Sequence, residues 1–150
     1  MCPLVESGKI DAIPECLRMN AALVFTPYRH KRFSENIQVV DDDFGVFPPL
    51  NLAYAAAIAE RAGHRVIMVD ANAEGLSAAE VVARLRAFQP DGVGFYFSTY
   101  MFHDTLAYAQ AVKDALGVPI LAGGINLLLY PRETLRHDAI DYGIRGQSVE

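Results

Sequence analysis

Short apolar runs alternate along this chain with longer segments in which apolar residues recur at helical spacing. The central run, residues 91–99 (DGVGFYFST), follows Pro90 and ends in two hydroxyl residues. Because its bulky residues do not alternate strictly, it has the pattern of a strand that is covered on both faces of a parallel sheet. We interpret this run as the central strand of an open α/β sheet.

Four further runs predict the other strands, at residues 21–26, 64–70, 118–122 and 140–145. The segments between these runs carry helical patterns, so strands and helices alternate. Because the crossovers of such a chain are right-handed, the alternation predicts a doubly wound parallel sheet of five strands. We expect the flavodoxin-like (Rossmann-like) α/β class with strand order 2-1-3-4-5.

The first predicted helix begins after residues 48–49, two prolines, and stops at Gly63, a residue typical of a helix C-terminus. A long irregular segment, residues 28–49, precedes it. The helical spacing places one apolar stripe toward the core. This stripe is Leu50, Tyr54, Ala57, Ile58 and Ala62.

Capping residues mark the ends of the later helices. Ser77 begins one helix and forms a capping box with Glu80. Another helix is predicted over residues 102–116 with Gly117 as its stop, and a short one over residues 131–137. The expected buried positions are Val81, Val82, Leu85 and Phe88 in the first of these, and Leu106, Ala109, Val112 and Leu116 in the second.

Length and composition fit one domain with a buried core. The chain has 150 residues, of which 52% are hydrophobic, and its mean hydropathy is +0.16. A net charge of -5 argues against nucleic acid or an anionic membrane as a partner. With no apolar run of membrane-spanning length and no secretory signal, we expect a cytoplasmic protein without a membrane partner.

The domain is expected to cover residues 21–150, with residues 1–20 as an N-terminal extension. The chain stops soon after the fifth predicted strand, where a doubly wound domain usually adds a closing helix. We therefore expect it to be the N-terminal module of a longer polypeptide. Cys2 and Cys16 form neither a zinc pattern nor a disulfide framework.

Several common α/β functions lack their motifs here. The sequence has no GxGxxG after the first predicted strand, no GxxxxGK[ST] and no GxSxG. A phosphoreceiver domain would need a carboxylate at the end of the central strand, where Ser98 stands. What remains are small and hydroxyl residues at the carboxyl ends of strands, where open α/β sheets bind ligands. These candidate cofactor-binding residues are Ser98, Thr99, Tyr100, Gly123, Gly124 and Gly146.

Three features, in this order and spacing, carry a family resemblance: the PPLNLA helix start at residues 48–53, the DANAE turn at residues 70–74, and Ser98 followed by Gly123 and Gly124. Over residues 21–150 the chain resembles the cobalamin-binding domain that precedes the radical S-adenosylmethionine domain in cobalamin-dependent radical enzymes. The resemblance implies that the cofactor's nucleotide tail enters between the first and third strands. Ser98 and the glycine pair would then line the tail pocket.

The chain departs from the DxHxxG motif of other cobalamin domains, whose histidine replaces the lower axial ligand of cobalt. Tyr28 stands in place of the aspartate and Phe33 in place of the glycine. His30 could ligate cobalt, but we favour a loop histidine in a basic patch because it has no orienting carboxylate. The resemblance therefore leaves a protein-derived axial ligand in doubt.

Other side chains near the predicted site have ordinary alternatives. His103 could contact a corrin amide, although a capping or solvent role is favoured. Residues 41–43, three aspartates, could bind a metal but are interpreted as a solvated loop. Tyr100 with residues 101–102 either faces the corrin ring or packs into the core. We predict no catalytic and no metal-binding residue.

The resulting hypothesis is a cobalamin-binding module of a radical S-adenosylmethionine methyltransferase or cyclase. S-adenosylmethionine and a 4Fe-4S cluster would belong to a downstream radical domain, its partner, because no CxxxCxxC motif is present here. The chain would then not be a complete enzyme. Two alternatives stay open: a degenerate domain of this fold that serves as a packing module, and a small α/β nucleotide-binding domain.

Overall fold

The computed structural model describes residues 18–27 and 48–145. Five parallel strands form one sheet in the order β2-β1-β3-β4-β5, with β3 at its centre. The predicted fold class, strand order and central strand are therefore confirmed. The strands are β1 (Asn20–Phe25), β2 (Arg65–Asp70), β3 (Gly92–Tyr96), β4 (Ile120–Gly123) and β5 (Tyr142–Gly143).

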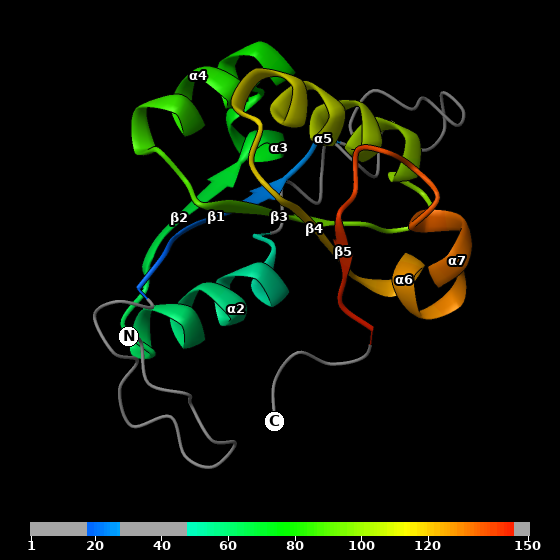
Figure 1. Cartoon of the computed structure of the whole chain (residues 1–150), viewed down its shortest axis with the longest axis horizontal. Coiled ribbons are helices and arrows are strands. Elements are labelled where there is room, and N and C mark those ends of the chain that lie inside the picture. The colour runs from blue at the N-terminus through cyan, green and yellow to red at the C-terminus, as the bar shows by residue number, and fades with distance from the viewer. Residues whose placement is uncertain (1–17, 28–47, 146–150) are drawn as a thin grey trace, which may run out of the picture.

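The helices lie on both sides of this sheet. Figure 1 shows α4 and α5 on one side and α2 on the other, with α6 and α7 beside β5 at the edge of the sheet. The helices are α2 (Leu50–Arg61), α3 (Ala71–Glu74), α4 (Ala78–Phe88), α5 (Phe102–Leu116), α6 (Ile125–Leu129) and α7 (Pro131–Thr134). No helix within the described residues is long and apolar enough to cross a membrane.

One face of the sheet, called the α4–α5 face below, forms the main core. Its strand residues are fully or almost fully buried and pack with apolar residues of α4 and α5. From the strands these are Ala22, Val24, Val93, Phe95, Ile120 and Ala122. From the helices they are Val81, Leu85, Ala109 and Val112. Burying this apolar set from both layers is the main contribution to the stability of the domain.

The opposite face, called the α2 face, is covered only in part. The prediction that the central strand is covered on both faces holds only in part: Val93 and Phe95 are buried, whereas Gly92, Gly94 and Tyr96 are half-buried. Glycine at two alternate positions removes side-chain bulk from one face, because residues i and i+2 point the same way in a strand. β3 therefore has one fully buried face and one half-buried face.

The predicted buried stripe of α2 is also wrong. Leu50, Tyr54 and Ile58 are exposed, at 64%, 66% and 37%, and only Leu52 is buried. A second apolar stripe, Leu52 with Ala55, Ala56 and Ala59, faces the sheet instead. Because α2 is apolar on more than one side, its periodicity does not decide which stripe packs.

Local signals gave reliable helix ends. Ser77 and Glu80 form the predicted capping box, and α5 has the predicted bounds with Gly117 in the left-handed conformation after it. The DANAE segment differs from the predicted turn, since α3 forms there with Asp70 accepting a hydrogen bond from the Ala73 N–H. The predicted helix over residues 131–137 shortens to α7, the strand over 140–145 shortens to β5, and α6 was not predicted.

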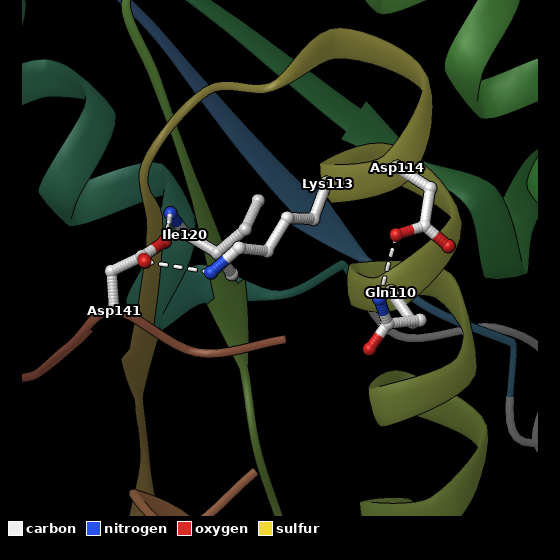
Figure 2. A network of polar contacts seen from close by, with 5 residues as sticks. All are labelled: Gln110, Lys113, Asp114, Ile120 and Asp141. Carbon is white, nitrogen blue, oxygen red and sulfur yellow. Dashed lines mark hydrogen bonds and ion pairs between the residues drawn. The ribbon is translucent and has the colours of Figure 1, made fainter. Parts of the chain in front are cut away.

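An ion pair ties the amino ends of β4 and β5 to α5. Lys113 Nζ lies 2.6 Å from Asp141 Oδ1, while Asp141 Oδ2 accepts a hydrogen bond of 2.8 Å from the Ile120 N–H (Figure 2). These two contacts hold the pKa of Asp141 below its ordinary value, with the Lys113 hydrogen bond as the larger cause. The two-residue β5 is thus held in place by a side chain just before it.

Candidate functional site

A cavity of about 990 Å³ lies on the α2 face of the sheet, and it is called the α2-face cavity below. Both Gly92 and Tyr96, the first and last residues of β3, line it. At roughly 3.3 Å per residue, a cavity that follows β3 from end to end is about 13 Å long. It is large enough for an elongated organic group and follows the strands from their amino ends to their carboxyl ends.

Glycines form much of the floor. A Cβ atom at Gly123 would meet no atom within 4 Å, and one at Gly92 would make only ordinary contacts, the nearest at 3.6 Å. The register places Gly92 beside Ala21 of β1 and Gly123 beside Tyr96 of β3. A Cβ atom at Gly92 or Gly123 would therefore be accommodated without a clash.

The walls of the α2-face cavity come from two helices. α2 contributes Asn51, Leu52, Tyr54 and Ala55 on one side, and α6 contributes Ile125 and Leu128 on the other. Among the described residues that line the cavity, none is an Asp, Glu, Lys or Arg, and the residues with polar side chains are Asn51, Tyr54, His64 and Tyr96. Such a lining suits an uncharged, largely apolar ligand group with a few oriented hydrogen bonds.

Gly123 and Gly124 both line this cavity, at the carboxyl end of β4. Gly124 has φ +108°, a conformation that L side chains rarely adopt. A Cβ there would lie 2.6 Å from the carbonyl oxygen of Phe97 and 2.8 Å from the Tyr96 ring. The backbone turn into α6 therefore requires glycine at position 124, whereas the absence of a side chain at Gly123 leaves space in the cavity.

Ser98, Thr99 and Tyr100 lie in the loop after β3 and are not among the residues that line the cavity. The Ser98 hydroxyl accepts a hydrogen bond of 3.2 Å from the Met101 N–H, at the start of α5. The Thr99 hydroxyl donates to Asn126 Oδ1 at 3.1 Å, and Tyr100 is 42% exposed. The structure thus brings Ser98 and Thr99 to the same sheet edge as the glycine pair, with their hydroxyls engaged in shaping the loop.

A buried polar chain holds this loop against α6 and α7. Asn126, only 4% exposed, donates from Nδ2 to the Thr134 hydroxyl at 2.7 Å, and that hydroxyl donates to the Tyr130 carbonyl. The Asn126 N–H also donates to the Phe97 carbonyl at 3.1 Å. These contacts fix the loop that carries Thr99 relative to the wall of the cavity.

The remaining candidates fall into two groups. Met101 is buried with Phe25 and Leu52, and the Phe102 ring contacts the rings of Phe97, His103 and His137. Met101 and Phe102 therefore pack into the core, whereas His103 is exposed. The other group, His30, the aspartates at 41–43 and Gly146, lies outside the described residues. Within the described residues, no group of three or more His, Cys, Asp or Glu side chains is placed to hold a metal.

Sequence reasoning missed Gly92, Gly94 and His64 as residues of this site. The signal for the two glycines was present, because their i, i+2 spacing in a strand puts both on one face. At Gly94 the Leu23 side chain uses the space, since a Cβ there would lie 2.8 Å from Leu23 Cδ2. No local signal identifies His64, which reaches the cavity only because β2 lies beside β1.

Comparison with known proteins identifies a family, a curated relative and a solved structure of similar fold. A family model described as the B12 binding domain matches residues 39–150. An uncharacterized methyltransferase from Pyrococcus horikoshii is 32% identical over 102 residues, which are 67% of this chain and 22% of that protein. A crystal structure of a cobalamin-binding protein from Desulfitobacterium hafniense matches with a TM-score of 0.48 and 14% identity, covering 85% of this chain and 53% of that one.

The chain thus spans about a fifth of the methyltransferase that it matches. The B12 binding domain model covers most of the chain, from residue 39 to residue 150. By this match, the chain belongs to the B12 binding domain family.

Proposed function

We propose that this domain binds cobalamin on the α2 face of its sheet, with the nucleotide tail in the α2-face cavity. Gly123 and Gly124 would lie beside the tail at the carboxyl end of β4. The corrin ring would lie over the carboxyl edge, next to Ser98, Thr99, Tyr100 and Gly146. The cobalt chemistry belongs to the cofactor, and the part of the protein is to hold and orient it.

The observation that carries this proposal is the space left by glycine. Cβ atoms at Gly92 and Gly123 would enter the cavity without a clash, so these positions keep room for a ligand rather than for neighbouring side chains. The cavity has the elongated form and the uncharged lining that a flat heterocyclic base and a sugar require. The residues present therefore fit the nucleotide tail.

Ser98 retains hydrogen-bonding capacity for the cofactor. Its oxygen accepts from the Met101 N–H, but a hydroxyl also has one hydrogen to donate. A polar oxygen of the cofactor at the sheet edge would accept this hydrogen. Replacing Ser98 by Ala should weaken cobalamin binding by about 1 kcal/mol, the worth of one hydrogen bond.

For the longer protein, we propose a role as the cobalamin module of a radical S-adenosylmethionine methyltransferase or cyclase. Support for a methyl-transfer context comes from the Pyrococcus horikoshii relative, which is named a methyltransferase. S-adenosylmethionine and the iron–sulfur cluster would be bound by a separate radical domain, the partner of this module. The rival function, a packing module without cofactor, predicts that cobalamin does not bind.

A titration of hydroxocobalamin into the chain, followed by visible absorption and by co-elution in gel filtration, tests the proposal. Wild type should bind one equivalent, and Gly123→Val should bind at least tenfold more weakly because its side chain fills the cavity. Ala83→Val, on the exposed side of α4, is the matched control and should bind like wild type. Failure of folded wild type to bind, or equal binding by folded Gly123→Val, would contradict the proposal.

A further inference from the structure

A histidine lines the amino end of the α2-face cavity, and the glycines of the cavity floor do not account for its role. His64, which immediately precedes β2, lines the cavity together with Met19, Ala21 and Gly92. This is the end of the sheet opposite to the Gly123–Gly124 turn. A ligand that follows the cavity from the carboxyl edge would reach His64 last.

The imidazole is held in one orientation. The Met19 N–H donates a hydrogen bond of 3.2 Å to His64 Nδ1. The backbone around it is fixed as well, because the His64 N–H donates to the Ala59 carbonyl and the Arg65 N–H donates to the Met19 carbonyl. An Nδ1 atom that accepts a hydrogen bond carries no proton, so the neutral ring has its N–H at Nε2.

His64 therefore offers a hydrogen-bond donor at the far end of an otherwise apolar space. Its neighbours there, Met19, Ala21 and Gly92, bring no polar side chain. Because no described lining residue is an Asp, Glu, Lys or Arg, this end suits a neutral acceptor rather than a phosphate. A ring nitrogen of a flat heterocycle has that chemistry, and an apolar slot accommodates the rest of its surface.

We infer that His64 recognises the heterocyclic base at the end of the cofactor's nucleotide tail by donating from Nε2 to a ring nitrogen. This inference rests on the proposed function, since it assigns one residue of the same site. It makes His64 a specificity residue, which distinguishes corrinoids with a nucleotide base from those without one. Binding of the corrin ring itself would not depend on His64.

The test compares two corrinoids on the same variants. Cobalamin has the nucleotide tail, and cobinamide lacks it. His64→Phe keeps a flat ring but removes the donor, so it should bind cobalamin about tenfold more weakly, the worth of one hydrogen bond, and cobinamide within twofold of wild type. His64→Gln restores an N–H donor near the Nε2 position and should bind cobalamin within about threefold of wild type.

Ala83→Val, on the exposed side of α4 and outside the cavity, is the matched control, and circular dichroism confirms folding of each variant. Unchanged cobalamin binding by His64→Phe, or an equal loss for both corrinoids, would overturn the assignment of His64 while leaving the proposed function standing. If wild type binds neither corrinoid, the proposed function fails and the assignment falls with it.

Discussion

A Cβ atom at Gly124 would lie 2.6 Å from the carbonyl oxygen of Phe97, closer than carbon and backbone oxygen approach in proteins. The same carbonyl accepts the hydrogen bond from the Asn126 N–H, so it has little freedom to move. Gly124 is therefore required by the path of the chain from β4 into α6. Its neighbour Gly123 carries no such constraint.

This difference predicts that substitutions at the two adjacent glycines change the free energy of unfolding by very different amounts. Gly124→Val should lower the free energy of unfolding by about 3 kcal/mol or more, because it combines a clash with a φ of +108°. Gly123→Val should change it by less than about 1 kcal/mol. Urea unfolding followed by circular dichroism measures both. Similar losses for the two variants would show that the cavity beside Gly123 is not free space.

Asp141 should make stability depend on pH in the acid range. Its pKa in the folded state is held below the ordinary 3.8 by Lys113 and by the Ile120 N–H. Its contribution is therefore complete above pH 3.8 and is lost as the pH falls through the lower folded-state pKa. At neutral pH, Asp141→Asn should cost about 1 kcal/mol, since the pair is partly exposed.

Urea unfolding at neutral pH and near pH 3 measures this effect. Asp114→Asn is a suitable control, because Asp114 lies near Lys113 on α5 but accepts its hydrogen bond from Gln110 (Figure 2). The cost of Asp141→Asn should shrink on acidification, whereas a cost that is the same at both pH values would exclude the ion pair as its source.

The chain by itself should not assemble a radical-type iron–sulfur cluster. Such a cluster needs three thiolates, and Cys2 and Cys16 are the only cysteines. After anaerobic reconstitution with iron and sulfide, wild type should show no more cluster absorption than the double variant Cys2→Ser, Cys16→Ser. A stoichiometric cluster in wild type alone would place iron–sulfur chemistry in this domain and contradict the assignment of that chemistry to a partner.

Sequence could predict the features that are set by neighbouring residues. The capping box of Ser77 and Glu80 and the stop at Gly117 depend on local hydrogen bonds and backbone conformation, so the helix ends followed from the residue types. The doubly wound parallel sheet followed from the alternation of elements and the handedness of their connections, and the order 2-1-3-4-5 is one of the two common orders of such sheets. These parts of the fold required no knowledge of long-range packing.

The cavity could not be predicted in this way, because it depends on which surface is left uncovered. α2 has two apolar stripes, and only tertiary packing turns Leu52 rather than Leu50 toward the sheet. The glycine pair at the end of β4 was visible in the sequence, but Gly92 becomes part of the floor only because this face of β3 is covered in part. His64 reaches the cavity through strand pairing with a segment more than forty residues away.

The central claim is that cobalamin occupies the α2 face of the sheet, and chemical-shift mapping tests it most directly. In ¹H–¹⁵N spectra of the chain titrated with hydroxocobalamin, ring currents of the bound base should shift the amides of Gly92, Gly94 and Gly123 most strongly. The amides of Val81 and Val112, which pack on the α4–α5 face, should stay near their original positions. Saturable shifts confined to the α4–α5 face, or no saturable shifts at all, would contradict the account.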